Sequence, residues 1–545
     1  MPETPPADAK AAEPLGEQAS QIAAGYTFDG PALDLGRLVE GEDVVPVDIR
    51  IPLSMLNRHG LVAGATGTGK TKTLQVLAEQ LSDQGVAVFA ADMKGDLSGL
   101  ASAGRGDDRL LARTTSLGQA WEATSYPVEL LALGGQGTGV PIRATMTSFG
   151  PTLLAKVLGL NETQESSLEL VFHYADTAGL PLLDLRDLRA VVQFLVSDDG
   201  KPELKALGGL SSATAGVILR ELIGFAAEGA GAFFGEPEFD TADLLRTTQD
   251  GKGVISLLEL PNLQDRPTVF STFLLWLLAD LFHDLPEEGD LDQPKLVFFF
   301  DEAHLLFDDS SEAFLDAIEL AVRLIRSKGI GVFFVTQSPT DVPDSVLAQL
   351  GSRVQHQLRA HTPNEAKALK ATVRTYPKSA YDLEQVLTQL GIGEAIVTVM
   401  NDRGAPTPVA WTRLRAPESL MDPSSADAMG ALIAASPLAA KYAEAADRDS
   451  ANEMLTKRLD EAAAKREGED AAEAAEKQRA KEAREASTRS RPKPRSESGG
   501  TWTGSGGGDV LGDITGSREF KDFLRTTGKS LAKEIARGVF KVGRR

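Results

Sequence analysis

Hydrophobic positions along the chain fall into short, nearly continuous runs that alternate with segments of helical periodicity. Such runs are typical of strands covered by helices on both faces, so the alternation predicts an α/β domain, at 57–437, with a mainly parallel sheet. The turn Asn401-Asp402-Arg403-Gly404 predicts a hairpin to an antiparallel edge at 408–413. The strands are expected at 60–64, 86–91, 128–133, 253–258, 296–300, 330–336, 353–358 and 395–400.

Two segments inside this domain depart from the alternation. Residues 151–246 have helical periodicity with almost no strand signal, which predicts a helical subdomain inserted into the sheet domain. The most apolar window, 269–282, is shorter than the ~20 residues that a spanning helix needs, and it contains Asp280. It is therefore expected to be a buried helix, and no transmembrane segment is predicted.

Composition divides the rest of the chain. Residues 1–26 are acidic and rich in Pro and Ala, so they are expected to be a disordered leader, and 27–56 are expected to contain one or two strands. Ala, Glu, Lys and Arg dominate 438–487, which predicts a long exposed helix. A flexible linker is expected at 488–515, followed by a basic amphipathic tail at 516–545.

Charge limits the partners. The chain carries 56 Lys and Arg against 78 Asp and Glu, a net charge of −22, so any DNA contact must come from a local basic patch or channel. The tail has nine basic and three acidic residues, and it could tether DNA, lie on a membrane surface or dock on the acidic body. Cysteine is absent, which excludes disulfides and Cys-ligated zinc. No signal peptide is visible, and a soluble, cytoplasmic protein is expected.

The strongest chemical signal is a glycine-rich loop between a predicted strand and a predicted helix. Its backbone N–H groups can surround phosphates, Lys70 can reach the β- and γ-phosphates, and the Thr71 hydroxyl can bind Mg²⁺. Thr73, in the helix that follows, is expected to join the nucleotide-binding set. The loop matches GxxxxGK[ST] with Gly64, Ala65, Thr66, Gly67, Thr68, Gly69, Lys70 and Thr71.

Polar residues follow two of the predicted strands. Asp301 and Glu302 end the run 296–300, where Asp301 would lie beside the magnesium and Glu302 could polarise the attacking water. A helix N-cap with an acid in its first turn is the alternative. Gln337 ends the run 330–336; it would sense the γ-phosphate if its strand lay between the other two, and would otherwise only begin a loop.

Three arginines could stabilise charge on the γ-phosphate: Arg323, Arg326 and Arg353. Arg323 and Arg326 share one face of the helix expected after Glu302. A favourable interaction with the C-terminal end of that helix would equally explain both cations.

Together these runs resemble the HerA-like branch of the FtsK–HerA P-loop ATPases, most closely a YjgR-type subgroup of presumed helicases. The similarity extends from 53 to 442. The runs that carry it are GATGTGKT at 64–71, DMKGDLSGL at 92–100, FFFDEAHLLF at 298–307 and RLIRSKGIGVFFVTQSP at 323–339.

The resemblance implies a RecA/ASCE-type core, hexameric rings with ATP and Mg²⁺ between subunits, and DNA translocation through a central pore. It makes Lys70 and Thr71 the Walker A residues, Asp301 (with Thr71, a magnesium ligand) and Glu302 the Walker B residues, and Gln337 the sensor. Arg326 is then the candidate arginine finger in trans.

Arg353 is implied to act in cis. HerA-like proteins of archaea carry a sizeable N-terminal β-barrel, of which 27–56 would be a reduced remnant, so a nuclease partner is doubtful. The expected function is an ATP-driven DNA translocase or helicase. A nucleotide-dependent switch or scaffold, and a motor for a protein substrate, are the alternatives.

Overall fold

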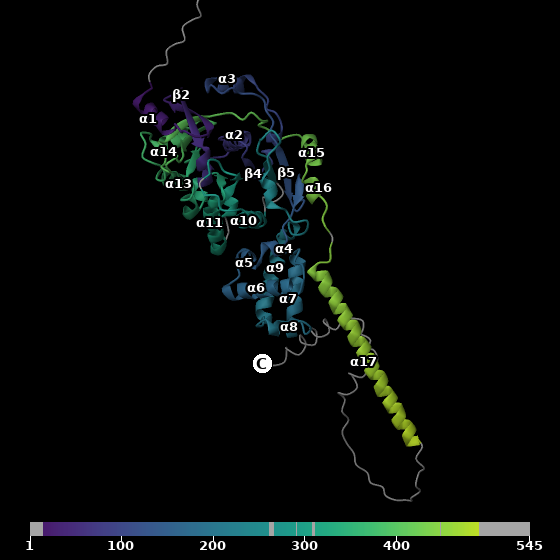
Figure 1. The fold of residues 1–545 in the computed structure, drawn as a ribbon. Coiled ribbons are helices and arrows are strands. Elements are labelled where there is room, and N and C mark those ends of the chain that lie inside the picture. The colour runs from purple at the N-terminus through teal and green to yellow at the C-terminus, as the bar shows by residue number, and fades with distance from the viewer. Residues whose placement is uncertain (1–14, 261–265, 290, 308–310, 447, 490–545) are drawn as a thin grey trace, which may run out of the picture. The chain divides into compact units, whose positions relative to one another are not determined.

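The computed structural model describes residues 15–489, except 261–265, 290, 308–310 and 447 (Figure 1). The chain divides into two units, Met1–Ala463 and Ala464–Arg545. The expected tail, and all but the first two residues of the expected linker, lie outside the described residues. Within the described part, none of the helices combines the length and apolarity that a membrane crossing requires.

A 12-stranded sheet organises the first unit, in the order β2-β1-β12-β11-β10-β3-β9-β8-β4-β7-β5-β6. The strands from β10 to β6 run parallel to one another, while the pairings from β2 to β10 are antiparallel. The predicted α/β fold with a mainly parallel sheet is therefore confirmed. The parallel strands are β3 (Gly60–Ala63), β4 (Ala87–Asp92), β5 (Val128–Leu133), β6 (Val140–Ile142), β7 (Ile255–Glu259), β8 (Leu296–Phe300), β9 (Ile330–Thr336) and β10 (Ser352–Gln355).

Two hydrophobic clusters cover the two faces of this sheet. Phe298 and Phe300 belong to one cluster, with side chains of α10 (Pro267–Asp284) and α11 (Glu312–Ile325). Phe299 belongs to the other, with side chains of α2 (Lys70–Asp83). Because successive strand residues point to opposite faces and both faces are covered, the central strands are apolar throughout. The apolar window of α10 is buried, as expected.

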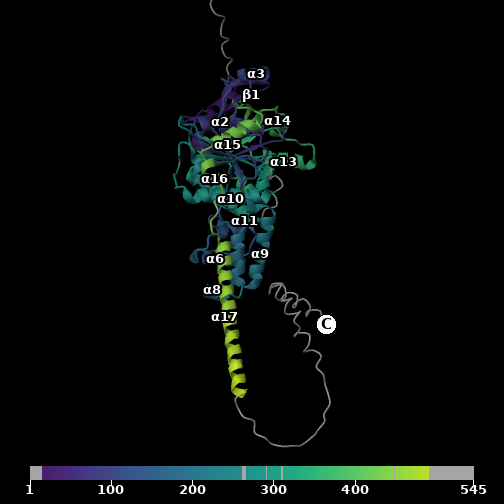
Figure 2. The same ribbon diagram turned by 90° about the vertical axis from the view of Figure 1, so that its right-hand side faces the viewer.

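The helical insert follows β6, and its helices gather at one end of the sheet domain (Figures 1 and 2). Side-chain caps begin its main helices: Asn161 and Gln164 form a capping box on α6, and Asp184 and Asp187 form one on α7. The helices are α4 (Met146–Phe149), α5 (Pro151–Val157), α6 (Glu162–Thr177), α7 (Leu185–Val196), α8 (Lys201–Ala206) and α9 (Ser212–Ala227).

The N-terminal segment differs from its prediction. Residues 17–25 form the helix α1, in which Ala19 and Ile22 are buried, so a disordered leader over 1–26 is wrong for this part. The buried Tyr26 donates a hydrogen bond to Val397 O at 2.9 Å, which ties the helix to the sheet. The antiparallel strands are β1 (Ala32–Glu40), β2 (Asp43–Pro52), β11 (Glu394–Thr398) and β12 (Ala410–Leu414).

Strands β1 and β2 extend the ATPase sheet. Strand β1 pairs with β12 as well as with β2, so residues 27–56 form the antiparallel edge of the main sheet rather than a separate barrel remnant. The hairpin predicted between β11 and β12 is present. The remaining helices of the sheet domain are α3 (Asp108–Ser116), α12 (Asp344–Leu347), α13 (Pro363–Val373) and α14 (Leu383–Gln389).

The C-terminal helix begins later than expected. Helices α15 (Ala426–Ala435) and α16 (Ala439–Tyr442) come first, and α17 (Ala451–Arg489) follows. Ala451 and Leu455 are buried in the first unit, which fixes the start of α17. From residue 464 to 483 the side chains of α17 are exposed.

Candidate nucleotide-binding site

The sheet brings polar residues from neighbouring strands to one edge. In the order β3-β9-β8-β4-β7, the carboxyl ends carry Gly64, Gln337, Asp301, Asp92 and Glu259 in turn. Strand β9 lies between β3 and β8, which is the sheet order that a sensor role for Gln337 requires. In open parallel sheets, ligands bind outside the carboxyl ends of the strands, so the candidate site is expected at this edge.

The glycine-rich loop joins β3 to the N-terminus of α2. Gly67 (φ +81°) and Gly69 (φ +112°) adopt left-handed backbone conformations that favour glycine. A β-carbon at Gly64 would lie 2.5 Å from His356 Cβ, so that position is closed to larger residues. The loop and helix end therefore have the geometry of an anion-binding site.

The side chain of Lys70 folds over this loop. Its Nζ donates to Gly64 O at 2.7 Å and to Ala65 O at 3.3 Å. Burial lowers the pKa of Lys70, while the charge of Glu302 opposes that shift. The lysine thus places its ammonium inside the loop, where it can bind phosphate oxygens.

Side-chain oxygens that could hold magnesium lie in the same part of the site as Lys70. The Thr71 hydroxyl donates to Asp96 Oδ2 at 3.3 Å, and Asp301, which is 5% exposed, accepts from Glu302 N at 2.9 Å. Burial, and then the charge of Glu302, raise the pKa of Asp301 to about 7. In the described part of the chain no cluster of three acidic, His or Cys residues could hold a metal alone. This donor set fits Mg²⁺, which is usually held by one or two side chains, water and substrate phosphates.

Glu302 adopts a left-handed backbone conformation (φ +49°) directly after β8. Its Oε1 accepts a hydrogen bond from Lys94 Nζ, whereas its buried Oε2 has no hydrogen-bond partner among the described residues. His304 Nδ1 lies 3.4 Å from Oε2. Burial would raise the pKa of Glu302, but the hydrogen bond and charge of Lys94 outweigh it, so the pKa is lowered.

Gln337 is exposed and lines a hollow of about 460 Å³ that reaches Ala65 and Thr66 of the phosphate loop. The loop that carries Gln337 is held by Asp341, whose Oδ2 accepts from Thr336 Oγ1 at 2.6 Å and from Ser338 N at 2.8 Å. Gln337 is therefore placed beside the phosphate loop.

Two expected residues lie elsewhere. The buried Thr73 hydroxyl contacts Gly69 O at 3.3 Å and His356 Nε2 at 3.0 Å, so it supports the loop from behind instead of facing a nucleotide. Arg353 Nη1 donates to Thr375 O at 3.3 Å, and its guanidinium lies 5.9 Å from the Tyr376 ring centroid. A role in cis is not supported, because Arg353 sits early in β10 and these partners hold its side chain.

Arg326 follows α11 and is half-buried. The charge of Arg326 helps to lower the pKa of His59, which directly precedes β3. Arg326 therefore lies near the amino edge of the sheet, opposite the phosphate loop. A role in a neighbouring subunit stays a prediction.

Three residues at the site were not predicted from the sequence. Lys94 pairs with Glu302, His356 lies against the phosphate loop, and Arg359 Nη2 donates to Thr66 O at 3.3 Å. The sequence could have indicated two of them, because His356 and Arg359 come soon after β10, the strand next to β3. Lys94 belongs to the run DMKGDLSGL, in which no local pattern indicates a chemical role for a lysine.

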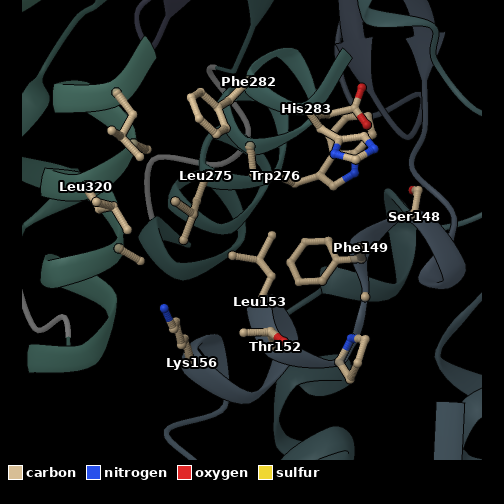
Figure 3. A pocket seen from close by; sticks show the side chains of 17 residues that line it. Ser148, Phe149, Thr152, Leu153, Lys156, Leu275, Trp276, Phe282, His283 and Leu320 are labelled. Atoms are coloured by element: carbon tan, nitrogen blue, oxygen red, sulfur yellow. The ribbon is translucent and has the colours of Figure 1, made fainter. Parts of the chain in front are cut away.

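A separate apolar hollow of about 510 Å³ lies between α5, α10 and α11 (Figure 3). Figure 3 shows Leu153, Leu275, Phe282 and Leu320 around it, with Lys156 at its edge. Its lining is largely hydrocarbon and no phosphate loop borders it. It therefore lacks the phosphate-binding loop that marks the site at the sheet edge.

The sequence profile of one family, described as "Helicase HerA-like C-terminal", matches residues 38–545. The chain belongs to this HerA-like family. The expected resemblance is thereby confirmed, while the narrower YjgR-type assignment stays a prediction. No curated protein matches the HerA-like chain significantly.

Solved structures that are similar to the HerA-like chain include two of the coupling protein TrwB and one of VirB4. The bacterial conjugative coupling protein TrwBdeltaN70 is 16% identical with a TM-score of 0.47, covering 75% of the HerA-like chain and 95% of its own. The plasmid coupling protein TrwB in complex with ADP and Mg²⁺ is 17% identical (TM-score 0.46; 72% and 98% covered). VirB4 of Thermoanaerobacter pseudethanolicus is 14% identical (TM-score 0.43; 71% and 97% covered).

Proposed function

We propose that this HerA-like protein is an ATP-hydrolysing motor that moves along DNA as a translocase or helicase. The observation that carries the proposal is the single sheet edge at which Lys70, Thr71, Asp301, Glu302 and Gln337 meet. An anion-binding loop, oxygen ligands and a carboxylate with a buried oxygen that accepts no hydrogen bond from the described residues suit phosphoryl transfer to water.

Each residue has one role in this proposal. The loop N–H groups and Lys70 bind the β- and γ-phosphates, and Thr71 and Asp301 hold Mg²⁺, which neutralises phosphate charge. Glu302 accepts the proton of a water whose oxygen attacks the γ-phosphorus as the bond to ADP breaks. Gln337 donates a hydrogen bond to the γ-phosphate and so reports its presence.

The proposal includes a homo-oligomeric ring, with six subunits as the expected number and an ATP site at each interface. Arg326 supports this part, because it lies at the sheet edge opposite its own phosphate loop and could act only on a neighbour. A guanidinium supplied in trans stabilises the charge that develops on the γ-phosphate. A cytoplasmic location is proposed as well, and a nuclease partner remains doubtful.

DNA is the proposed polymer because the family description names helicases. The net charge of −22 restricts DNA contacts to a local surface such as a pore. A slow nucleotide-dependent switch or scaffold, and a motor for a protein substrate, would use the same ATP site. These alternatives differ from the proposal in whether DNA changes the rate of ATP turnover.

The test is ATP turnover with and without double-stranded DNA, on a sample whose mass in solution has been measured. We expect DNA to stimulate turnover by a species of oligomeric mass, and Glu302→Gln protein to give no turnover in either case. Turnover that DNA leaves unchanged over a range of salt concentrations would favour the switch or the protein motor.

A further inference from the structure

The loop after β4 places a second lysine at the site. Lys94 Nζ donates a hydrogen bond to Glu302 Oε1 and forms an ion pair with it. The Lys94 side chain is 43% exposed and that of Glu302 is 10% exposed, so the contact is formed at the border between the buried edge and solvent.

The backbone that carries Lys94 is held rigidly. The carboxylate of Asp92 is fully buried and accepts the backbone N–H groups of Lys94, Gly95, Asp96 and Leu97, at distances from 2.8 to 3.3 Å. The same loop reaches the magnesium ligand, since Asp96 accepts the hydrogen bond of the Thr71 hydroxyl. The flexible side chain of Lys94 is therefore the part that can move while the loop stays in place.

The ion pair restrains Glu302 as a base. The ammonium of Lys94 occupies Oε1 of Glu302, and its positive charge opposes the transfer of a further proton to this carboxylate. Glu302 Oε2 receives no hydrogen bond from the described part of the chain, so Lys94 makes the one side-chain hydrogen bond described for this carboxylate, while His304 Nδ1 lies 3.4 Å from Oε2. For Glu302 to activate water fully, the ammonium of Lys94 must leave Oε1.

A γ-phosphate would supply the competing anion. The site that binds it lies next to Glu302, since an attacking water must lie between the two. Lys70 lies inside the phosphate loop, whereas Lys94 is the lysine that contacts Glu302. A terminal phosphate carries more negative charge than one carboxylate and has several acceptor oxygens, so it can outcompete Glu302 for the ammonium.

We propose that Lys94 is a switch lysine: it holds Glu302 when no γ-phosphate is present and transfers its ammonium to the γ-phosphate when ATP binds, which frees Glu302. The inference rests on the proposed ATP site and is independent of DNA. With this switch, Glu302 activates water only when a triphosphate is bound, and Lys94 holds Glu302 in the ADP-bound and nucleotide-free states.

The test compares the affinities for ADP and for the non-hydrolysable analogue ADPNP in wild type, Lys94→Met, Glu302→Gln and the double variant. We expect Lys94→Met to weaken ADPNP binding about tenfold, the usual effect of losing one charge-assisted hydrogen bond, and to leave ADP binding unchanged. Glu302→Gln should strengthen ADPNP binding, because the amide no longer retains the ammonium. This gain should be smaller in the Lys94→Met background.

Turnover separates a switch from a permanent restraint. At saturating ATP, Lys94→Met should hydrolyse more slowly than wild type, and Lys94→Arg should recover part of the rate. Faster turnover by Lys94→Met would overturn the proposal, because Lys94 would then hold Glu302 even with ATP bound. Equal losses of ADP and ADPNP affinity, or no loss of either, would overturn it as well.

Lys201→Met is the matched control. Lys201 also pairs with a carboxylate, Asp198, at 2.7 Å, but it lies exposed on the insert. It should leave both affinities unchanged. If wild-type protein binds ADPNP but the variants do not show the expected changes in affinity, the role of Lys94 alone is rejected. Wild-type protein that binds neither nucleotide would reject the proposed function itself.

Discussion

The imidazole of His356 links the phosphate loop to helix α2, with Nε2 3.0 Å from Thr73 Oγ1 and Nδ1 3.1 Å from Thr68 O. A carbonyl can only accept, so Nδ1 carries the proton and Nε2 accepts from Thr73. Burial, and then the charge of Lys70, lower the pKa of His356 to about 3. A neutral histidine at the end of β10 thus fixes the loop from behind.

Replacing this histidine should therefore weaken nucleotide binding without removing any group that touches phosphate. His356→Ala leaves the Thr68 carbonyl and the Thr73 hydroxyl without this partner, which costs about 2 kcal/mol or more of folding free energy. We expect a lower Tm and a weaker affinity for ATP, measured by thermal unfolding and nucleotide titration. His173→Ala, at an exposed position on α6, should change neither. Unchanged ATP affinity in a destabilised His356→Ala protein would contradict a role in shaping the loop.

Lys70→Ala should reduce affinity for both ATP and ADP by about tenfold or more, because it removes the ammonium that lies inside the loop. Equilibrium titration with each nucleotide measures this. Lys201→Ala, at the surface of the insert, is the control for loss of a lysine. Full affinity in Lys70→Ala would mean that phosphates bind elsewhere.

Glu302→Gln should stop ATP turnover while leaving nucleotide binding at least as strong as in wild type. The amide keeps the shape of the side chain but cannot take a proton from water at neutral pH. Steady-state hydrolysis and ADPNP titration on the same preparation test the two parts together. Near-normal turnover would remove Glu302 from the role of water activator.

Several elements could be predicted closely, because local pattern and tertiary surroundings agree there. Strands β8 and β9 have the expected bounds, since apolar runs buried on both faces are unambiguous. Helix α1 was not predicted, because the N-terminus has an acidic composition rich in Pro and Ala. Its few apolar residues are buried only because the antiparallel edge of the sheet is present.

The network around the phosphate loop could be predicted only in part. Motif spacing indicated Lys70 and Thr71, which close a glycine-rich loop between a strand and a helix, and Asp301 and Glu302, which follow an apolar strand. The pair of Lys94 and Glu302 is 208 residues apart in the chain, and only the adjacency of β4 and β8 brings the two together. Which contacts a polar side chain makes across neighbouring strands depends on sheet order, which no local pattern contains.

The proposed role of Asp301 as a magnesium ligand predicts that magnesium binding depends on pH. Its pKa is raised to about 7 in the folded protein, mainly by burial, so part of the population is protonated near neutrality. Mg²⁺ requires the carboxylate and must displace that proton. We expect the Mg²⁺ affinity of the nucleotide complex to fall as the pH drops below about 7, measured by titration at about pH 6 and about pH 8.

The same raised pKa affects stability with the opposite sign. Between the unfolded pKa and the folded pKa the folded state binds more protons, so stability decreases as the pH rises through this window. Asp301→Asn should remove this contribution and raise the Tm of nucleotide-free protein at about pH 8 more than at about pH 5. An equal Tm change at both pH values would show that Asp301 is ionised throughout.

The last prediction concerns Arg326 and the ring. Arg326 lies at the amino edge of the sheet, so Arg326→Ala should lower turnover only through a neighbouring subunit and leave ATP affinity nearly unchanged. Arginine fingers contribute about 10³-fold or more to the rate, which sets the expected loss. Arg220→Ala is the control for loss of an arginine, because Arg220 is exposed on helix α9 of the insert.

Mixing then tests whether the site is shared. When Arg326→Ala and Glu302→Gln subunits exchange, some interfaces combine the intact Glu302 of one subunit with the intact Arg326 of its neighbour. These interfaces are wild type, so the mixture should regain turnover that neither variant has alone. A site contained within one chain would give only the sum of the two separate rates. Turnover independent of protein concentration, by a protein that stays monomeric with ATP, would likewise exclude a shared site.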